Sequence, residues 1–217
     1  MFYDPRRNNH KLPHNPWTAL VGPRPIGWIS TVSKAGVVNL APYSFFNIVS
    51  SYPPFLIFSS NPRKHSQINA EETGEFVANM ATWDLREAVN ASSADFADDV
   101  SEPERVGLDM LPCNNVKPPR VARSPVAIEC KYNKTVEMFS SDGKLNPSAI
   151  IIGEVIGVHI DDSVIVNGHV DLTLMKPIAR LGYMDYSVVD KIFSMQRPGK
   201  PHEDEAPEQS NDPTAVR

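Results

Sequence analysis

The sequence predicts a mainly β protein, built from short strands in an antiparallel sheet or barrel. The prediction rests on three apolar, strand-forming runs and the turn residues between them: Ile26–Val32, Val37–Leu40 and Phe55–Phe58, separated by Gly36 and by the Pro53-Pro54 pair. Short strands with Gly and Pro between them are typical of antiparallel β structure. The segment Ala41–Asn47 is rich in aromatic, hydroxyl and amide side chains. Such groups at strand ends suit a planar ligand with polar edges, so we expect a small-molecule site on the barrel.

The composition narrows the class of protein. The chain has 217 residues, of which 41% are hydrophobic, enough for one domain with its own core. Its net charge of −5 argues against a nucleic-acid partner, which requires a basic surface. No apolar run approaches the roughly 20 residues of a membrane-spanning helix, and no basic amphipathic helix suggests a membrane surface. Because the first residues lack the apolar core of a signal peptide, we expect a cytoplasmic protein.

Cysteine and histidine give no metal-ligand pattern. The two cysteines, Cys113 and Cys130, lack a second ligand pair for zinc, and the six histidines show no ligand spacing. We therefore expect structural thiols and no metal site. A redox-active cysteine pair is the less favoured alternative in a cytosolic protein.

Beyond the third run, the sequence predicts alternating short helices and strands. A turn at 61–64 precedes a helix over Ser66–Glu72, which Gly74 ends, and a strand over Phe76–Ala81. A second helix is expected over Asp84–Ala91, with Asp84 as its cap. An acidic, turn-like segment at 95–103 and one helical turn within 104–111 follow.

Two long strands are expected in the second half, after a loop that holds four prolines, Pro112–Pro125. The strands are Val126–Met138 and Ala149–Ile160. Polar residues alternate along the first of them, which predicts one solvent-exposed face; they are Glu129, Lys131, Asn133, Thr135 and Glu137.

The two ends of the chain differ from the part between them. Residues 1–20 are polar and Pro-rich, and we expect a lead-in along the surface that Trp17 anchors. Residues 196–217 contain almost no apolar side chain, which predicts a disordered tail. A single barrel domain over 21–195 lies between them.

The predicted helix start near His65 is a candidate anion site. Free N–H groups and the helix dipole favour an anion there, and Arg63, Lys64, His65 and Ser66 offer further donors. The residues alone leave a second interpretation open, in which Arg63 and Lys64 are surface charges and Ser66 merely caps the helix. The sequence has no Gly-x-Gly-x-x-Gly motif after a strand, so we expect no Rossmann nucleotide domain.

Seven segments form an ordered set from about Val21 to Tyr186: PRPIGWIST, NLAPYSFFN, SSYPPFLIFSS, RKHSQINAEETGEFVAN, VKPPRVARSPVAIEC, IIIGEVIGVHID and ARLGYMDYS. In this order they resemble the flavin reductase-like family of FMN-binding split-barrel proteins. The resemblance implies an antiparallel Greek-key split β-barrel with short flanking helices. It also implies that FMN is the cofactor and that the helix start holds its phosphate.

The resemblance also implies which residues contact FMN. They come from the first strand, the aromatic segment, the strand after the double proline, the helix start and two later segments: Ser30, Thr31, Ala41, Pro42, Tyr43, Ser44, Phe45, Asn47, Ser59, Ser60, Arg63, Lys64, His65, Ser66, Asn90 and Arg180.

Pro42 is expected to stiffen a loop. Phe46 is expected in the core, because neighbouring strand residues point to opposite faces, while Phe45 is left open between core and ligand. Many relatives have Asp-Thr at His65-Ser66 and Gly-Gly at Gly182-Tyr183.

The implied activity is that of an NAD(P)H:flavin oxidoreductase, in which NADH or NADPH gives hydride to flavin N5. Because the cofactor performs this chemistry, we expect no catalytic side chain. The resemblance further implies a homodimer with the flavin cleft at the subunit interface, and a partner monooxygenase as one recipient of reduced flavin. Two alternatives stay open: a flavoredoxin-like electron-transfer protein that does not oxidise NAD(P)H, and a flavin-free binding module with the same barrel.

Overall fold

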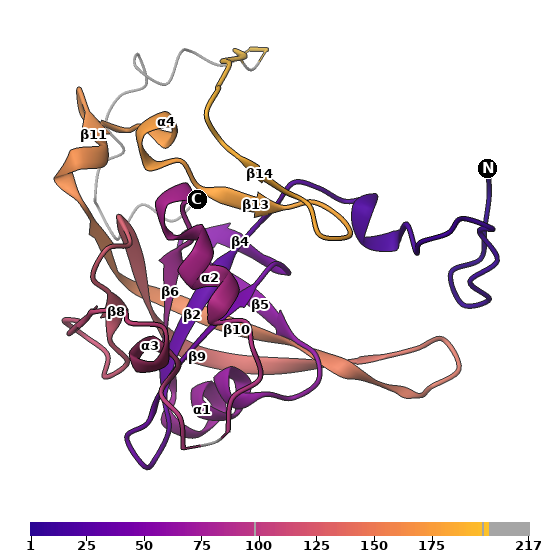
Figure 1. The fold of residues 1–217 in the computed structure, drawn as a ribbon, viewed down its shortest axis with the longest axis horizontal. Coiled ribbons are helices and arrows are strands. Elements are labelled where there is room, and N and C mark those ends of the chain that lie inside the picture. Colours follow the sequence, from indigo (N-terminus) through magenta and orange to yellow (C-terminus); the bar gives the residue numbers. More distant parts are fainter. Residues whose placement is uncertain (98, 197, 200–217) are drawn as a thin grey trace.

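The fold is mainly β, as predicted (Figure 1). The computed structural model describes residues 1–97, 99–196 and 198–199. Apart from residues 196, 198 and 199, the predicted disordered tail therefore lies outside the described residues. Within the described part, no helix is both long and apolar enough to cross a membrane.

Seven antiparallel strands form the main sheet. In spatial order they are β3 (Val38–Tyr43), β2 (Gly27–Val32), β6 (Glu75–Met80), β9 (Val126–Phe139), β10 (Leu145–Ile160), β5 (Pro54–Ser60) and β4 (Phe46–Ser51). Three hairpins, β2–β3, β4–β5 and β9–β10, are joined by crossovers, which is Greek-key connectivity. The fold class expected from the sequence is confirmed.

The two outer strands of the sheet, β3 and β4, follow each other directly in the chain. Only Ser44 and Phe45 separate them, and the N–H of Ser59 on β5 donates to the carbonyl of Phe45 at 2.9 Å. A link of two residues cannot cross an open seven-stranded sheet, since an extended residue spans at most about 3.6 Å. The sheet therefore curls until its two edges meet, which produces the barrel.

The expectation of a loop at Pro42 was wrong, because β3 and β4 include all but two residues of the segment Ala41–Asn47. Pro42 lies within β3, paired with Trp28 of β2. No other described strand pairs with the far side of β3, so the missing N–H of Pro42 costs the sheet little. Proline argues against a strand in the middle of a sheet, where its missing N–H would leave a neighbouring strand unpaired. In an edge strand such as β3 it is tolerated, so the proline alone does not predict a loop.

Two apolar clusters lie on opposite faces of the barrel sheet, since Trp28 of the first and Ile29 of the second are neighbours on β2. The first, around Trp28 and Leu85, packs between the sheet and the flanking elements, and the second, around Phe58 and Phe76, fills the barrel interior. Phe46 packs against the second cluster, as predicted for a core residue. Gly27 makes room for it, because a Cβ at this position would overlap the Phe46 ring. Phe45 points outward and is 50% exposed.

Short helices, helical turns and small sheets surround the barrel. In chain order they are η1 (Trp17–Ala19), β1 (Arg24–Pro25), α1 (His65–Thr73), η2 (Trp83–Leu85), α2 (Arg86–Ala91), α3 (Glu102–Arg105), β7 (Met110–Leu111), β8 (Arg120–Val121), η3 (Asp162–Val164), β11 (Ile165–Val166), β12 (His169–Val170), α4 (Leu172–Met175), β13 (Ile178–Arg180) and β14 (Tyr186–Val188). Helix α1 and its left-handed end at Gly74, φ 75°, confirm the sequence prediction.

Several expected details differ from the structure. Asp84 caps no helix, because it lies inside η2 and α2 begins after Leu85 without a side-chain cap. The helical turn expected within 104–111 is α3, which begins earlier at Glu102, and β7 occupies the end of that range. The proline-rich loop contains β8, which pairs with β7.

The N-terminal lead-in does not lie along the barrel, and Trp17 does not anchor it. Trp17 is 57% exposed, and the segment before η1 extends away from the barrel in Figure 1. Arg24 holds the start of the domain instead, because its guanidinium donates to the carbonyls of Thr18, Val21 and Leu181. The segment is thus held by hydrogen bonds from Arg24 to backbone carbonyl groups, and not by the expected packing of the Trp17 ring.

Glu129 was predicted on a solvent-exposed face of β9, but it is fully buried. Its carboxylate accepts the backbone N–H groups of Asn114 and Asn115, at 2.8 and 2.7 Å, and lies 2.5 Å from Nε2 of His159. The proline-rich loop covers this end of the strand. These three partners stabilise the buried carboxylate. The alternation of exposed polar side chains along β9 therefore does not include Glu129.

Gly153 on β10 offers a test of the packing in the second cluster. A Cβ at Gly153 would overlap the Phe76 ring and lie 3.1 Å from Cβ of Cys130. We expect Gly153→Ala to lower the free energy of unfolding by about 1–3 kcal/mol, the usual cost of overpacking a core. Chemical denaturation measures this, and Phe76→Leu in the same chain should recover part of the loss. Strictly additive losses in the double mutant would contradict the contact.

Candidate functional site

A polar cavity of about 390 Å³ lies beside the start of α1. Its walls come from β3, the turn before α1, the segment after α2, and α3. It is lined by Asn39, Ala41, Tyr43, Arg63, Lys64, His65, Ser66, Ile68, Ser92, Ser93, Ala94, Asp95, Phe96 and Glu102. The volume is in the range of small-molecule sites in proteins.

The start of α1 supplies backbone donors to this cavity. Lys64 is the N-cap residue, with an extended backbone at φ −115°, and its side chain makes no capping hydrogen bond. The first N–H groups of an α-helix have no partner within the helix, so the start of α1 is a source of backbone donors beside the cavity. Because the helix dipole is positive at this end, an anion is the favoured ligand.

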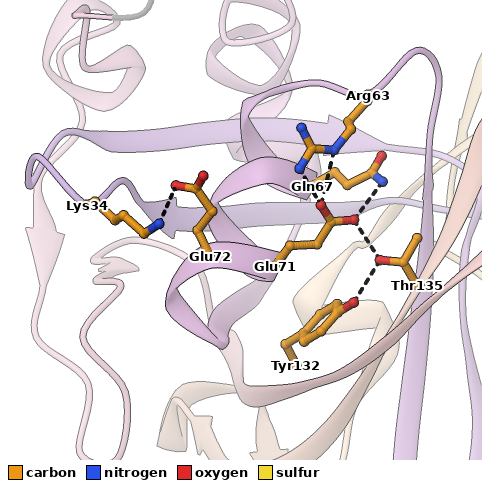
Figure 2. A network of polar contacts seen from close by, with 7 residues as sticks. All are labelled: Lys34, Arg63, Gln67, Glu71, Glu72, Tyr132 and Thr135. Carbon is orange, nitrogen blue, oxygen red and sulfur yellow. Dashed lines mark hydrogen bonds and ion pairs between the residues drawn. The ribbon is translucent and has the colours of Figure 1, made fainter.

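Arg63 is held in place by a hydrogen-bonded network on one side of the cavity. Figure 2 shows its guanidinium against Glu71. Nη2 of Arg63 lies 2.6 Å and Nε 3.1 Å from Oε2 of Glu71. The other oxygen of Glu71 accepts from Gln67 and from Thr135, both at 2.8 Å. Burial opposes ionisation of Glu71, but these hydrogen bonds outweigh it and lower its pKa below the ordinary value. Glu71 therefore stays ionised and fixes Arg63.

Lys64 has a different partner. Its Nζ lies 3.1 Å from the carboxylate of Asp95, in the segment after α2. The Asp95 side chain is 92% exposed and that of Lys64 47% exposed. An ion pair this exposed contributes little stability, so Lys64 can exchange Asp95 for a ligand at small cost.

The floor of the cavity is a buried polar cluster of Asn39, Ser66, Tyr43 and Glu102. The Asn39 amide lies between Oε1 of Glu102, at 2.9 Å, and Oγ of Ser66, at 2.8 Å. Both are satisfied when its nitrogen donates to Glu102 and its oxygen accepts from Ser66. Burial raises the pKa of the Tyr43 phenol, although hydrogen bonds with Ser66 and Ser60 oppose the shift.

Glu102 was not predicted as a site residue. It is 5% exposed, accepts the N–H of Leu40 at 3.1 Å, and has a raised pKa, chiefly because burial penalises its charged form. No local signal distinguishes it from the other acids of 95–104. Its burial results from the packing of α3 against β3, which only the folded chain shows.

Six of the predicted contact residues line this cavity: Ala41, Tyr43, Arg63, Lys64, His65 and Ser66. Ten do not line it in the single chain: Ser30, Thr31, Pro42, Ser44, Phe45, Asn47, Ser59, Ser60, Asn90 and Arg180. Ser30 and Thr31 are fully buried. Ser30 donates to the carbonyl of Pro119, and Thr31 accepts from Asn69. These two hydroxyls stabilise the sheet and do not reach the cavity.

Asn90 lines a second cavity, of about 380 Å³, between α2 and the β13–β14 pair. Arg180 lies beside it, with its guanidinium carbon 4.5 Å from the ring centre of Tyr186. Arg180 also donates to the carbonyl of Tyr183, which adopts the left-handed region at φ 55°. Glycine is favoured in that region, which accounts for Gly-Gly in many relatives at Gly182-Tyr183.

A group of three potential metal ligands occurs in the described part of the chain, although their spacing in the sequence does not indicate it. Ligand atoms of Cys113, Glu129 and His159 lie within 4.8 Å of one another. Glu129 is already hydrogen-bonded to two backbone N–H groups and to His159. Burial, with the nearby Glu129, raises the pKa of Cys113 to about 11 and also raises that of Cys130. Both cysteines are free thiols, as expected of structural residues.

Comparisons with known proteins find similar sequences and similar folds. The family model for the flavin reductase like domain matches residues 22–176. An uncharacterized protein of Halalkalibacterium halodurans is 34% identical over 202 residues, covering 89% of this chain and 92% of that protein.

Two solved structures have the same fold. Nitrilotriacetate monooxygenase component B from Bacillus cereus has a TM-score of 0.82 at 27% identity, covering 90% of this chain and 98% of that one. The 2-nitrobenzoate 2-nitroreductase NbaA of Pseudomonas fluorescens has a TM-score of 0.74 at 29% identity, with 86% and 91% covered.

Glu102 gives the cavity a testable pH response. Because its pKa is raised in the folded protein, the folded state takes up a proton more readily than the unfolded chain. The stability contributed by this group therefore falls as pH rises from the ordinary value of 4.5 through the raised one. We expect Glu102→Gln to gain stability relative to the wild type between pH 4.5 and neutral pH, measured by chemical denaturation. Glu104→Gln, an exposed acid on the same helix, should show no such trend. A constant difference for Glu102→Gln would contradict the assignment.

Proposed function

The chain belongs to the flavin reductase-like family, and we propose that it binds FMN and catalyses hydride transfer from NADH or NADPH to this flavin. One observation carries the proposal: the uncapped start of α1 opens into a cavity flanked by Arg63 and Lys64. The phosphate of FMN matches this donor set, since a phosphate dianion accepts several charge-assisted hydrogen bonds.

The residues present fit FMN in their chemistry. Backbone N–H groups at the start of α1, with Arg63 and Lys64, would hold the phosphate, and the polar side chains near Asn39 suit ribityl hydroxyls. The carboxyl of Glu102 lies on the floor of the cavity, where burial raises its pKa above the ordinary value. Tyr43 adds an aromatic wall next to these groups.

The protein's task is to hold and orient, because bound FMN would supply the hydride acceptor. No Rossmann motif is present in the sequence, so the nicotinamide nucleotide would bind beside the flavin. The same absence suits the alternative in which another protein reduces the flavin, as in flavoredoxins. Oxidation of NADH or NADPH separates the two.

We extend the proposal to the protein's partners. Similarity to a monooxygenase component B supports a partner monooxygenase as recipient of the reduced flavin. The barrel edge supports a homodimer, because β4 and the turn after it expose Ile48, Val49 and Tyr52, at 66%, 54% and 87%. Neighbouring exposed apolar side chains on one edge are typical of an interaction surface. Such a complex would work in the cytoplasm.

The phosphate assignment predicts that FMN binds more tightly than riboflavin, which lacks the phosphate. Lys64→Ala should weaken FMN binding by about 1 kcal/mol, roughly fivefold, because the half-exposed ammonium is screened by solvent. Riboflavin binding should not change. Quenching of flavin fluorescence measures both affinities, and equal affinities of the wild type for FMN and riboflavin would refute the assignment.

Asp95 and Ser66 provide matched controls for this experiment. Asp95→Asn removes the carboxylate that competes with the phosphate for Lys64, so FMN affinity should rise. Ser66→Ala should have a smaller effect than Lys64→Ala, because the backbone N–H groups remain. Weaker FMN binding by Asp95→Asn would show that the Lys64–Asp95 pair itself builds the site.

The proposed activity predicts that the protein oxidises NADH or NADPH when FMN is present in excess. The absorbance of the reduced nicotinamide measures the rate, and Lys64→Ala should raise the FMN concentration needed for half the maximal rate. FMN binding without oxidation of either nucleotide would favour the electron-transfer alternative. Absence of both would leave a binding module with the family fold.

A further inference from the structure

The second cavity has a different character from the first. It has a volume of about 380 Å³ and lies between α2 and the β13–β14 pair, with Trp83, Arg86, Asn90 and Tyr186 among its lining residues. Its base is the apolar cluster around Trp28, to which Val89 and Ile178 belong. Residues of α2 line it, whereas Ser92 and Ser93, just beyond α2, line the first cavity.

Two aromatic rings at this cavity are only partly covered. Trp83 is 45% exposed and Tyr186 44% exposed. Large rings stabilise a protein or a complex by the area that they bury, and they favour stacking with another ring. A cavity with an apolar base and two half-exposed rings therefore favours a flat aromatic ligand over a sugar or a hydrated ion.

An arginine lies against each ring. The guanidinium carbon of Arg86 is 4.1 Å from the ring centre of Trp83, and that of Arg180 is 4.5 Å from the ring centre of Tyr186. Arg86 donates to the carbonyl of Trp83 at 2.8 Å, and its Nε lies 3.5 Å from Glu87. A guanidinium has five N–H donors, so these contacts leave Arg86 with further donors.

The charges around the cavity favour an anion. Arg86 lines the cavity and Arg180 packs against its lining residue Tyr186, while Glu87 is the one carboxylate among the described residues that line it. The Glu87 side chain is 84% exposed, so solvent screens it. Asn90 and Ser187 add neutral polar groups.

We propose that this second cavity is a binding site for a small planar aromatic carboxylate. The ring of the ligand lies against Trp83 and Tyr186, and its carboxylate accepts from Arg86, whose planar fork matches a carboxylate. The site is separate from the proposed flavin site, so the proposal does not depend on FMN binding.

The experiment uses 4-fluorobenzoate as the probe and 4-fluorobenzyl alcohol as its neutral match, titrated with the full chain and followed by fluorine NMR. We expect the carboxylate to bind with a dissociation constant below about 1 mM and the alcohol at least fivefold more weakly. Arg86→Gln should weaken carboxylate binding about 5- to 20-fold and abolish the preference over the alcohol. Trp83→Leu, which keeps an apolar side chain at a half-exposed position, should weaken both probes.

Arg63→Gln is the matched control, because it removes an arginine from the first cavity. It should leave 4-fluorobenzoate binding unchanged, and saturating FMN should not displace the probe. Equal affinities for acid and alcohol, an unaffected Arg86→Gln variant, or no binding at millimolar probe would overturn the proposal. Full displacement by FMN would also overturn it, by assigning the cavity to the flavin.

Discussion

The two-residue link between β3 and β4 is the constraint on which the rest of the structure depends. These strands are the opposite edges of the seven-stranded sheet, yet only Ser44 and Phe45 join them. The sheet must therefore close on itself, and the closure brings β3 next to the start of α1, which follows β5. Without it, Asn39 and Tyr43 of β3 would not lie beside the start of α1. The candidate site is thus a consequence of how the barrel closes.

Two buried carboxylates complete this arrangement. Each accepts backbone N–H groups and so joins a flanking segment to a strand of the barrel, where no strand pairing among the described residues does so. Glu102 accepts the N–H of Leu40 and joins α3 to β3, while Glu129 accepts those of Asn114 and Asn115 and fixes the proline-rich loop over β9. The two environments shift the pKa in opposite directions. Burial dominates at Glu102 and raises it, whereas hydrogen bonds outweigh burial at Glu129 and lower it. Glu129 is therefore a fixed structural charge, and Glu102 is a group whose charge responds to its surroundings.

The sequence predicted what local chemistry determines, and missed what depends on contacts between distant segments. Helix α1, its end at Gly74 and the core position of Phe46 follow from capping, glycine and strand alternation, and the structure confirms them. Pro42 indicated a loop, because the sequence does not show that β3 is an edge strand. The burial of Glu102 and the engagement of Ser30 by Pro119 each require a contact across more than sixty residues. The resemblance located the start of α1 correctly, but it could not separate the two cavities beside α2.

The neighbouring cations Arg63 and Lys64 illustrate how the fold gives different roles to similar residues. Glu71 holds Arg63 at two nitrogen atoms and is itself held by Gln67 and Thr135, so the guanidinium is ordered before any ligand arrives (Figure 2). Lys64 has an exposed carboxylate as its partner, and its side chain keeps more freedom. A cation that is already ordered loses little conformational entropy when an anion binds, whereas a flexible one must be ordered first. Arg63 therefore provides a fixed positive charge at the helix start, whereas under the proposed function Lys64 would exchange Asp95 for the ligand.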